Sequence, residues 1–289
     1  EGGDKRVDRT GVGTLSGFGA TMRFDLSDSV IPIFTTKRVY WKLAVKEMLW
    51  FLTGQTNIRS LLEQGVRIWT DWPLANYRSA TGEHVAQEEF EARVLGDVKF
   101  AEEWGDLGPV YGKQWRNWID SEGREHDQIA TVIDALKSNP TSRRILFHAW
   151  NVGDLHRMAL PPCHMVYQFH VSGLNNAVGA PPKLSMMVFQ RSCDLFLGCP
   201  FNVAQQAVLL NMIAQQVGMD VGELVWSGGD VHLYLNHLEQ VREQISREPR
   251  MFPRLRFTRH PASIDDYRID DFEVTGYQPH AAIAADVAV

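Results

Sequence analysis

The chain has 289 residues, of which 44% are hydrophobic and 22% are charged, and its formal net charge is −6. This length suits one large globular domain or two smaller ones, with a core that needs no disulfide bonds. The negative charge argues against binding to DNA or to an anionic membrane surface, and no apolar run approaches the roughly 20 residues of a membrane-spanning helix. The odd number of cysteines favours a reducing cytoplasm, and no cysteine or histidine spacing predicts a metal site.

Hydrophobic patterns in the first third of the chain predict two helical regions. Residues Tyr40–Thr53 are apolar on nearly every side, which predicts a buried helix. The segment from Pro73 to Trp104 is richer in Ala, Glu and Gly. We expect it to be a solvated peripheral insertion with one helix near Val85–Leu95.

The remaining segments predict a mixture of strands and one long helix. Three stretches rich in β-branched and aromatic residues are expected to be strands: Arg144–Trp150, Met165–Val171 and Leu184–Gln190. Residues Asn202–Val217 are expected to form a second buried helix that ends near Gly218. Because strands and helices mix without strict βαβ alternation, we expect an α/β or α+β fold with one large sheet, in a single domain over residues 1–289.

A nucleophile is predicted at Cys163, which follows two prolines that exclude a helix there. On a rigid strand start, beside His164 and near arginines, its thiol could ionise with a depressed pKa and attack an electrophile. An inert buried thiol is the alternative for a cysteine considered alone. Cys193 and Cys199 are assigned structural roles.

Four arginines stand at the expected ends of elements, beside small polar residues. Arg9 lies in a glycine-rich turn, Arg143 and Arg144 open a strand, and Arg191 ends one. A guanidinium offers a planar fork for oxyanions, so the set predicts a dianion site for phosphate or carboxylate. Surface salt bridges are the alternative for each arginine.

Each of the two buried helices carries one polar residue of interest. Glu47 has Leu43, Trp50 and Phe51 as helical neighbours. Its carboxyl is therefore expected to be desolvated, with a raised pKa suited to proton transfer, or to be a paired structural acid. Asn202 starts the second helix, either as an N-cap or as an amide that pairs with a ring carbonyl and a ring N–H.

Five further residues have types that suit a heterocyclic ligand. Asp194 could accept a hydrogen bond from a ring N–H, and His232 and Tyr234 share one face of an extended segment, where they could bind sugar hydroxyls. Trp69 and Trp72 offer flat surfaces on which a bicyclic ring could stack. The alternative for each is a structural role in the core or on the surface.

Ordered motifs along the chain resemble those of the thymidylate synthase family. The longest is GDLGPVYGKQWR at 105–116. The others include DRTG at 8–11, TTKR at 35–38, SRR at 142–144, PPCH at 161–164, QRS at 190–192, PFN at 200–202 and HLY at 232–234. The resemblance runs from Asp8 to Val289, apart from 73–104. It implies a three-layer fold whose large mixed sheet packs against that of a second subunit in an obligate homodimer.

The resemblance also implies an activity, the C5 methylation of dUMP to dTMP. Cys163 would attack C6 of the uracil, and 5,10-methylenetetrahydrofolate would donate the one-carbon unit and a hydride. Glu47, Tyr111 and His164 would organise water and proton transfer, and Asn202 would read the uracil edge. The implied nucleotide-binding residues are Arg9, Gln190, Arg191, Ser192, Asp194, His232 and Tyr234, with Arg143 and Arg144 reaching over from the partner subunit. The implied folate contacts are Ile68, Trp69, Trp72, Asp194, Leu197, Gly198, Phe201, Val287 and Ala288.

Some positions depart from the family pattern and keep two alternatives open. The tail at 284–288 lacks a cation and a proline and gains an acid, Phe189 replaces a tyrosine, and Gln205 and Gln206 alter the helix behind Asn202. One alternative is a hydroxymethylase of dUMP, dCMP or CMP, in which water captures the exocyclic methylene. The other is a catalytically silent nucleotide-binding module. Trp69 favours methylation, and Asn202 favours uracil.

Overall fold

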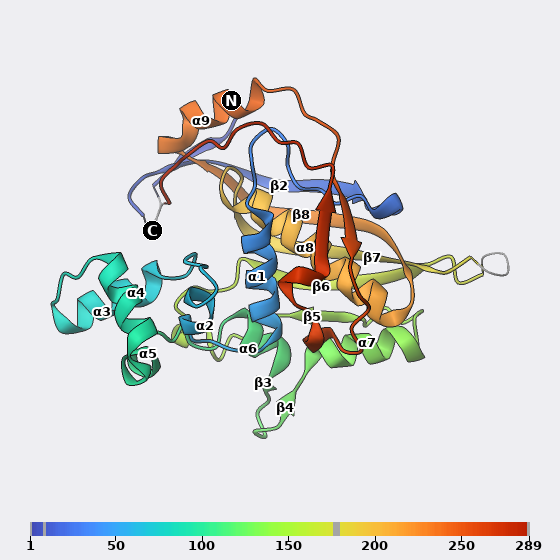
Figure 1. The fold of residues 1–289 in the computed structure, drawn as a ribbon, viewed down its shortest axis with the longest axis horizontal. Coiled ribbons are helices and arrows are strands. Elements are labelled where there is room, and N and C mark those ends of the chain that lie inside the picture. Colours follow the sequence, from blue (N-terminus) through green and yellow to red (C-terminus); the bar gives the residue numbers. More distant parts are fainter. Residues whose placement is uncertain (1, 8–9, 176–179, 288–289) are drawn as a thin grey trace. The chain divides into compact units, whose positions relative to one another are not determined.

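The structure is a computed structural model that describes residues 2–7, 10–175 and 180–287 (Figure 1). The chain divides into two compact units, each assembled from segments that are distant in sequence. The first, called the sheet unit below, comprises Glu1–Val45, Thr131–Phe147 and Cys163–Val289. The second, the helical unit, comprises Lys46–Ala130 and His148–Pro162. Helices α1 (Trp41–Leu52) and α7 (Gln128–Ser138) continue across the boundaries between these segments.

A six-stranded mixed sheet forms the centre of the sheet unit, with strand order β1-β2-β8-β7-β6-β5. Strands β7 and β8 are parallel, whereas the pairs β1–β2, β2–β8 and β6–β7 are antiparallel. The strands are β1 (Asp4–Arg6), β2 (Thr14–Asp25), β5 (Leu146–His148), β6 (His164–Ser172), β7 (Lys183–Asp194) and β8 (Asp220–Tyr234). A parallel pair needs a crossover connection, which helix α8 (Gly198–Val217) supplies. This mixed α/β architecture confirms the predicted fold class.

Side-chain alternation explains how α8 covers one face of this sheet. On β7, Leu184, Met186 and Val188 are buried, while the intervening Met187 and Phe189 are exposed. A period of two therefore turns one apolar face toward α8, which contacts both β7 and β8. Each fully buried side chain of this kind contributes roughly 1.5–3 kcal/mol.

Helix α8 is buried along most of its length and ends at Gly218, whose φ of 68° favours glycine. Among the described residues, no helix combines the length and hydrophobicity that crossing a bilayer requires. The sheet unit also contains α9 (Leu238–Ile245), which follows β8.

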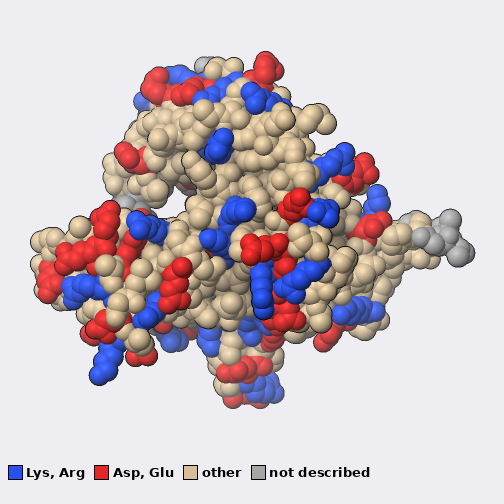
Figure 2. All heavy atoms as spheres, in the orientation of Figure 1, with Lys and Arg blue, Asp and Glu red and all other residues tan. Residues whose placement is uncertain are grey.

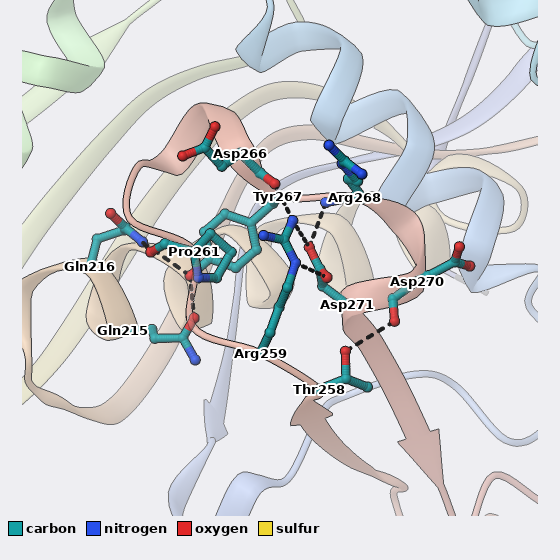
Figure 3. A network of polar contacts seen from close by, with 10 residues as sticks. All are labelled: Gln215, Gln216, Thr258, Arg259, Pro261, Asp266, Tyr267, Arg268, Asp270 and Asp271. Atoms are coloured by element: carbon teal, nitrogen blue, oxygen red, sulfur yellow. Dashed lines mark hydrogen bonds and ion pairs between the residues drawn. The ribbon is translucent and has the colours of Figure 1, made fainter.

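A small hairpin is anchored to the C-terminal end of α8 in the same unit. It consists of β9 (Arg254–Phe257) and β10 (Phe272–Thr275). In the loop between them, Arg259 donates to both oxygens of the buried Asp271, at 2.5 and 2.8 Å (Figure 3). The Tyr267 hydroxyl donates to Gln215 near the end of α8. These bonds fix the loop against the helix.

The helical unit is built from short helices. They are α2 (Arg59–Leu62), α3 (Asp71–Thr81), α4 (Gln87–Gly96), α5 (Val98–Trp104) and α6 (Tyr111–Arg116), followed by the hairpin of β3 (Trp118–Ile119) and β4 (Glu125–His126). The end of α1 and the start of α6 approach so closely that a Cβ on Gly112 would lie 2.4 Å from the carbonyl oxygen of Phe51. Only glycine fits there without a shift of the backbone.

Residues 73–104 differ from the expected solvated segment with one helix. They contain most of α3 and all of α4 and α5, which pack around Tyr77, with ring centroids 5.6 Å from Phe90, 5.4 Å from Phe100 and 5.1 Å from Trp104. Acidic side chains gather on the outside of these helices (Figure 2), among them the exposed Glu83, Glu88, Glu89, Glu102 and Glu103. Composition reflected that acidic surface, whereas the spaced aromatic residues built the core.

Three other expectations changed in detail. The predicted strand Arg144–Trp150 is reduced to Leu146–His148. The helix predicted from Asn202 begins at Gly198 instead, because Pro200 fits a first helical turn, where no N–H partner is required. Asn202 therefore lies inside α8, and its interpretation as an N-cap is wrong. The helix predicted at Tyr40–Thr53 and the strands at Met165–Val171 and Leu184–Gln190 are confirmed within a few residues.

Candidate active site

Sheet register brings the predicted nucleophile next to an arginine. His164 on β6 pairs with Gln190 on β7, so Cys163, just before β6, lies beside Arg191. The Arg191 amide donates to the Cys163 carbonyl at 2.8 Å, and its guanidinium Nη2 lies 3.9 Å from the Cys163 Sγ. The thiol is partly exposed, and a nearby cation favours the thiolate over the thiol.

His164, the neighbour of Cys163, is not a cation. The ring is buried, and this desolvation lowers the pKa of His164 to about 3, so the imidazole is neutral at pH 7. Its Nδ1 lies 2.6 Å from the Tyr167 hydroxyl. Sequence reasoning missed Tyr167, because the bulge between His164 and Val166 decides which β6 residue shares the histidine's side of the sheet.

Asn202 reaches the same region from the first turns of α8. Its Oδ1 accepts a hydrogen bond of 2.9 Å from Nε2 of Gln190, which is buried. Asp194, at the end of β7, accepts from the Phe196 amide at 2.9 Å and so shapes the turn that leads into α8. A Cβ built on Gly198 would lie 3.7 Å from both Asp194 and Asn202. The glycine therefore leaves a small space between these two side chains.

The end of β8 carries the predicted hydroxyl-binding pair. His232 and Tyr234 lie side by side, with ring centroids 5.3 Å apart in an edge-on arrangement. The Nδ1 of His232 lies 3.0 Å from Asp230, whose carboxylate also accepts from Ser16 at 2.9 Å and from Arg6 at 3.1 Å. This network fixes the orientation of the imidazole, and the register Asp194↔His232 places it across from the end of β7.

Lys37 is a residue near this site that the sequence analysis did not single out. It is buried, its ammonium donates to the Phe196 carbonyl at 2.5 Å, and it lies 3.5 Å above the Phe196 ring. Burial lowers the pKa of Lys37 to about 8, although Asp194 opposes the effect. Lys37 lies in the TTKR motif, but a charged residue in a polar motif gives no indication that it is buried.

The helical unit contains the second group of predicted site residues. Glu47 is buried, and its Oε1 accepts a hydrogen bond of 2.6 Å from the Trp69 indole. Tyr111 is also buried, and its ring centroid lies 4.9 Å from Phe51 and 6.1 Å from Trp69. The sequence had assigned Glu47 to proton transfer and Trp69 to stacking, whereas the structure joins them in one hydrogen bond.

The edge of this aromatic cluster is accessible. Trp72 is partly exposed, with its ring centroid 5.2 Å from that of Trp69, and 38% of Ile68 is exposed. The open aromatic face can bind a flat ring. The carboxylate beside it, held by the indole, can direct a proton or a water molecule.

The other predicted residues have simpler surroundings. Arg143 and Arg144 are exposed, and neither has an acidic partner among the residues that the structure describes. Val287 is 62% exposed, just after Asp286, whose carbonyl lies 2.7 Å from Nε2 of His237. Ser192, Leu197 and Phe201 are partly exposed around the end of β7 and the start of α8. Arg9 and Ala288 lie outside the described residues.

In the sheet unit, a thiol, an amide and an imidazole each have a polar partner. Within the described ranges, no cluster of His, Cys, Asp and Glu has the composition of a metal site. The thiol beside a guanidinium, the oriented amide of Asn202 and the held imidazole of His232 suit covalent chemistry on a polar, anionic small molecule. Such chemistry is typical of group-transfer enzymes.

Comparison with known proteins gives the family. A sequence model of the thymidylate synthase family matches residues 1–289. Thymidylate synthase of Rhizobium rhizogenes is 74% identical over 290 residues, covering 100% of this chain and 94% of the relative. That of Sinorhizobium fredii is 72% identical over 289 residues, with the same coverage, and that of Rhodopseudomonas palustris is 65% identical, covering 95% of the relative. The chain belongs to the thymidylate synthase family, and it is a transferase of one-carbon groups.

Proposed function

We propose that this enzyme methylates C5 of dUMP to give dTMP. The observation that carries the proposal is the 3.9 Å approach of the Arg191 guanidinium to the Cys163 thiol, in a chain of the thymidylate synthase family. The curated names of the relatives do not favour the hydroxymethylase alternative.

Cys163 acts first, as the nucleophile. Its thiolate forms a bond to C6 of the uracil, and the electrons of the C5–C6 double bond move toward C5 and O4. The Asn202 amide donates to O4, where negative charge develops, and so stabilises this step. The electrons released when the C5 proton is later lost break the bond between the one-carbon unit and its carrier, and Cys163 stays on C6. Once a hydride has reached the exocyclic carbon, the electrons of the resulting enolate re-form the C5–C6 double bond and Cys163 leaves as the thiolate.

The nucleotide is held at its other end by the residues around the strand ends. Arg191, Ser192 and Arg9 bind the phosphate, and His232 and Tyr234 bind the 3′-hydroxyl. The hydrogen bond between Asp230 and Nδ1 of His232 supports this assignment, because it directs the opposite ring nitrogen away from Asp230. Gln190 and Asp194 complete this set.

Glu47 organises proton transfer together with Tyr111 and His164. The Trp69 indole donates to the Glu47 carboxylate and thereby fixes the direction of its oxygens. His164, being neutral, serves as a hydrogen-bonding group rather than as a source of charge. An oriented, buried carboxylate of this kind contributes typically about 10²–10⁴-fold in rate.

5,10-Methylenetetrahydrofolate supplies the one-carbon unit and then the hydride. The residues of the helical unit fit its flat bicyclic ring, because Ile68 and Trp72 leave an accessible apolar face. We propose Asp194 and Gly198 as further contacts. Trp69, Leu197, Phe201, Val287 and Ala288 are the remaining contacts that we propose. Exclusion of water from this region protects the hydride step.

We further propose that the enzyme is a homodimer. The face of the sheet away from α8 carries Met187, 47% exposed, and Phe189, 41% exposed. Such an apolar face is usually covered in solution, and a second copy of the sheet covers it symmetrically. Arg143 and Arg144 would then bind the phosphate of the partner subunit. Light scattering should give a mass of two chains for the native protein, and Phe189→Asp should lower that mass toward one chain. A monomeric native protein would refute the dimer.

We also propose a cytoplasmic location. Cys163, Cys193 and Cys199 are all free thiols. A nucleophilic cysteine needs a reducing compartment to remain in the thiol form.

The test of the function is turnover of purified protein with dUMP and methylenetetrahydrofolate. Dihydrofolate is followed by absorbance, and the nucleotide product is identified by mass spectrometry. dTMP in equal amount to dihydrofolate is the expected result. A 5-hydroxymethyl nucleotide without dihydrofolate would establish the hydroxymethylase instead, and the absence of both turnover and a covalent adduct with 5-fluoro-dUMP would identify a silent module.

A further inference from the structure

We propose that Trp226 is a positioning residue that sets the preference for uracil by fixing the amides of Gln190 and Asn202. The inference rests on the proposed function and adds to it the origin of its base specificity. Trp226 is fully buried on β8, and the sequence motifs assigned it no role.

Three groups form a continuous hydrogen-bonded relay. The Trp226 Nε1 donates to Oε1 of Gln190 at 2.9 Å. The Gln190 Nε2 donates to Oδ1 of Asn202 at 2.9 Å and to the Ser192 carbonyl at 3.1 Å. Both Trp226 and Gln190 are buried, so water does not compete for these bonds.

The chemistry of the indole gives this relay a direction. An indole N–H can only donate, so the Gln190 atom facing it must be the carbonyl oxygen. The Gln190 NH₂ must then point toward Asn202, and the Asn202 atom that receives it must be Oδ1. The Asn202 NH₂ is consequently presented on the other side of the amide. An amide alone could take either orientation. The Trp226 N–H, which only donates, and the Ser192 carbonyl, which only accepts, both favour this one, and the bond to Trp226 is the shorter of the two.

The backbone around Trp226 is shaped to allow this contact. In the parallel pairing of β7 with β8, Gln190 lies next to Gly228. A Cβ on Gly228 would come 2.3 Å from Cη2 of Trp226. The missing side chain therefore leaves the space in which the indole lies near Gln190.

The fixed direction discriminates between two pyrimidines. Uracil presents an acceptor at O4 and a donor at N3, whereas cytosine presents a donor at N4 and an acceptor at N3. An Asn202 amide whose NH₂ faces the exocyclic position matches uracil and meets cytosine donor against donor. Without the Trp226 N–H, the 3.1 Å bond to the Ser192 carbonyl is the one left to orient Gln190 in this relay. Both amides can then rotate by 180° more readily and accept cytosine.

The experiment compares binding of dUMP and dCMP to the full-length native protein and to Trp226→Phe, by calorimetry, together with kcat and KM for dUMP. We expect the ratio of the dCMP to the dUMP dissociation constant to fall by about tenfold, which is the effect of roughly one hydrogen bond. The matched control is Leu224→Ala, on the same buried face of β8, which removes apolar volume without a polar contact. It should lower stability and leave the ratio within about twofold.

An unchanged ratio in a folded Trp226→Phe protein would overturn the inference, as would an equal change in Leu224→Ala. If Trp226→Phe does not fold, replacement of the indole by benzothiophene at this single site keeps the shape and removes only the N–H, with the same two outcomes. Failure of the native protein to convert dUMP would instead defeat the proposed function, so the two failures are distinguishable.

Discussion

The two groups of site residues are held in place in different ways. In the sheet unit, Cys163 directly precedes β6, and Arg191 and His232 lie in the last residues of β7 and β8. Backbone hydrogen bonds fix the register of these strands. In the helical unit, Glu47 and Tyr111 come from different helices and are held by aromatic packing and one indole bond.

The difference has a physical consequence. A strand register is discrete, because a slip of one residue turns every side chain to the other face. The packing of an aromatic cluster can instead adjust gradually, and its side chains can partly close around a smaller ring. The free-energy cost depends on how completely the cavity is filled. Substitutions of site residues in the sheet unit should therefore cause a large loss of one property, such as turnover or base preference. Those in the helical unit should cause smaller losses of rate.

Replacing the nucleophile should give the largest effect. Cys163→Ser keeps the size of the side chain but loses a readily ionised thiol, so turnover should fall by at least about 10³-fold while dUMP binding is retained. Steady-state kinetics and calorimetry measure the two quantities. Cys199→Ala, at a buried thiol, is the control that should keep turnover. Substantial activity in Cys163→Ser would refute the nucleophile assignment.

The base reader offers a second test within the sheet unit. Asn202→Asp keeps the shape but replaces the NH₂ donor by an acceptor, so kcat/KM for dUMP should fall by about 10²-fold and preference should move toward dCMP. Asn211→Asp makes the same exchange on α8, where the amide donates to the Ala207 carbonyl at 2.8 Å. It should reduce stability without changing base preference. Unchanged preference in Asn202→Asp would show that other groups read the ring.

The helical unit should respond more mildly to loss of its hydrogen bond. Trp69→Phe removes the donor to Glu47, so kcat should fall by about tenfold as the carboxylate loses its fixed direction. Trp50→Phe is the matched control, because the buried Trp50 Nε1 has no hydrogen-bond partner among the described residues. Both variants should lose stability, but only Trp69→Phe should lose rate. Equal rate losses would mean that packing alone matters in this unit.

The smallest effect concerns the charge of Lys37 in the sheet unit. Its folded pKa of about 8 lies below the ordinary 10.5, so between these values the unfolded chain binds more protons than the folded one. Stability should therefore rise with pH across this window, as burial of the charged form ceases to cost free energy. In denaturant unfolding from pH 7 to 10, the free energy of unfolding of the native protein should rise relative to that of Lys37→Met. The exposed Lys42→Met should show no such gain, and a parallel pH dependence of native protein and Lys37→Met would contradict the prediction.

The sequence could predict those parts of the fold that depend on local pattern. Apolar residues on all sides predicted the buried helix at Tyr40–Thr53, and a run of β-branched and aromatic residues predicted β7. Pattern failed where geometry depends on the neighbours of an element. The aromatic core of α3–α5 was hidden beneath an acidic composition, and α8 began before Asn202 because the first helical turn accepts Pro200.

The sequence by itself determined the candidate chemistry of the site, because a cysteine behind two prolines, arginines beside small polar residues and an amide in an apolar helical segment are local facts. Only the tertiary structure decided which groups meet. It paired His164 with Tyr167, Glu47 with Trp69, and Gln190 with both Trp226 and Asn202. Periodicity records whether a side chain is buried, but a hydrogen bond between distant residues depends on strand register and helix placement, which no local pattern contains.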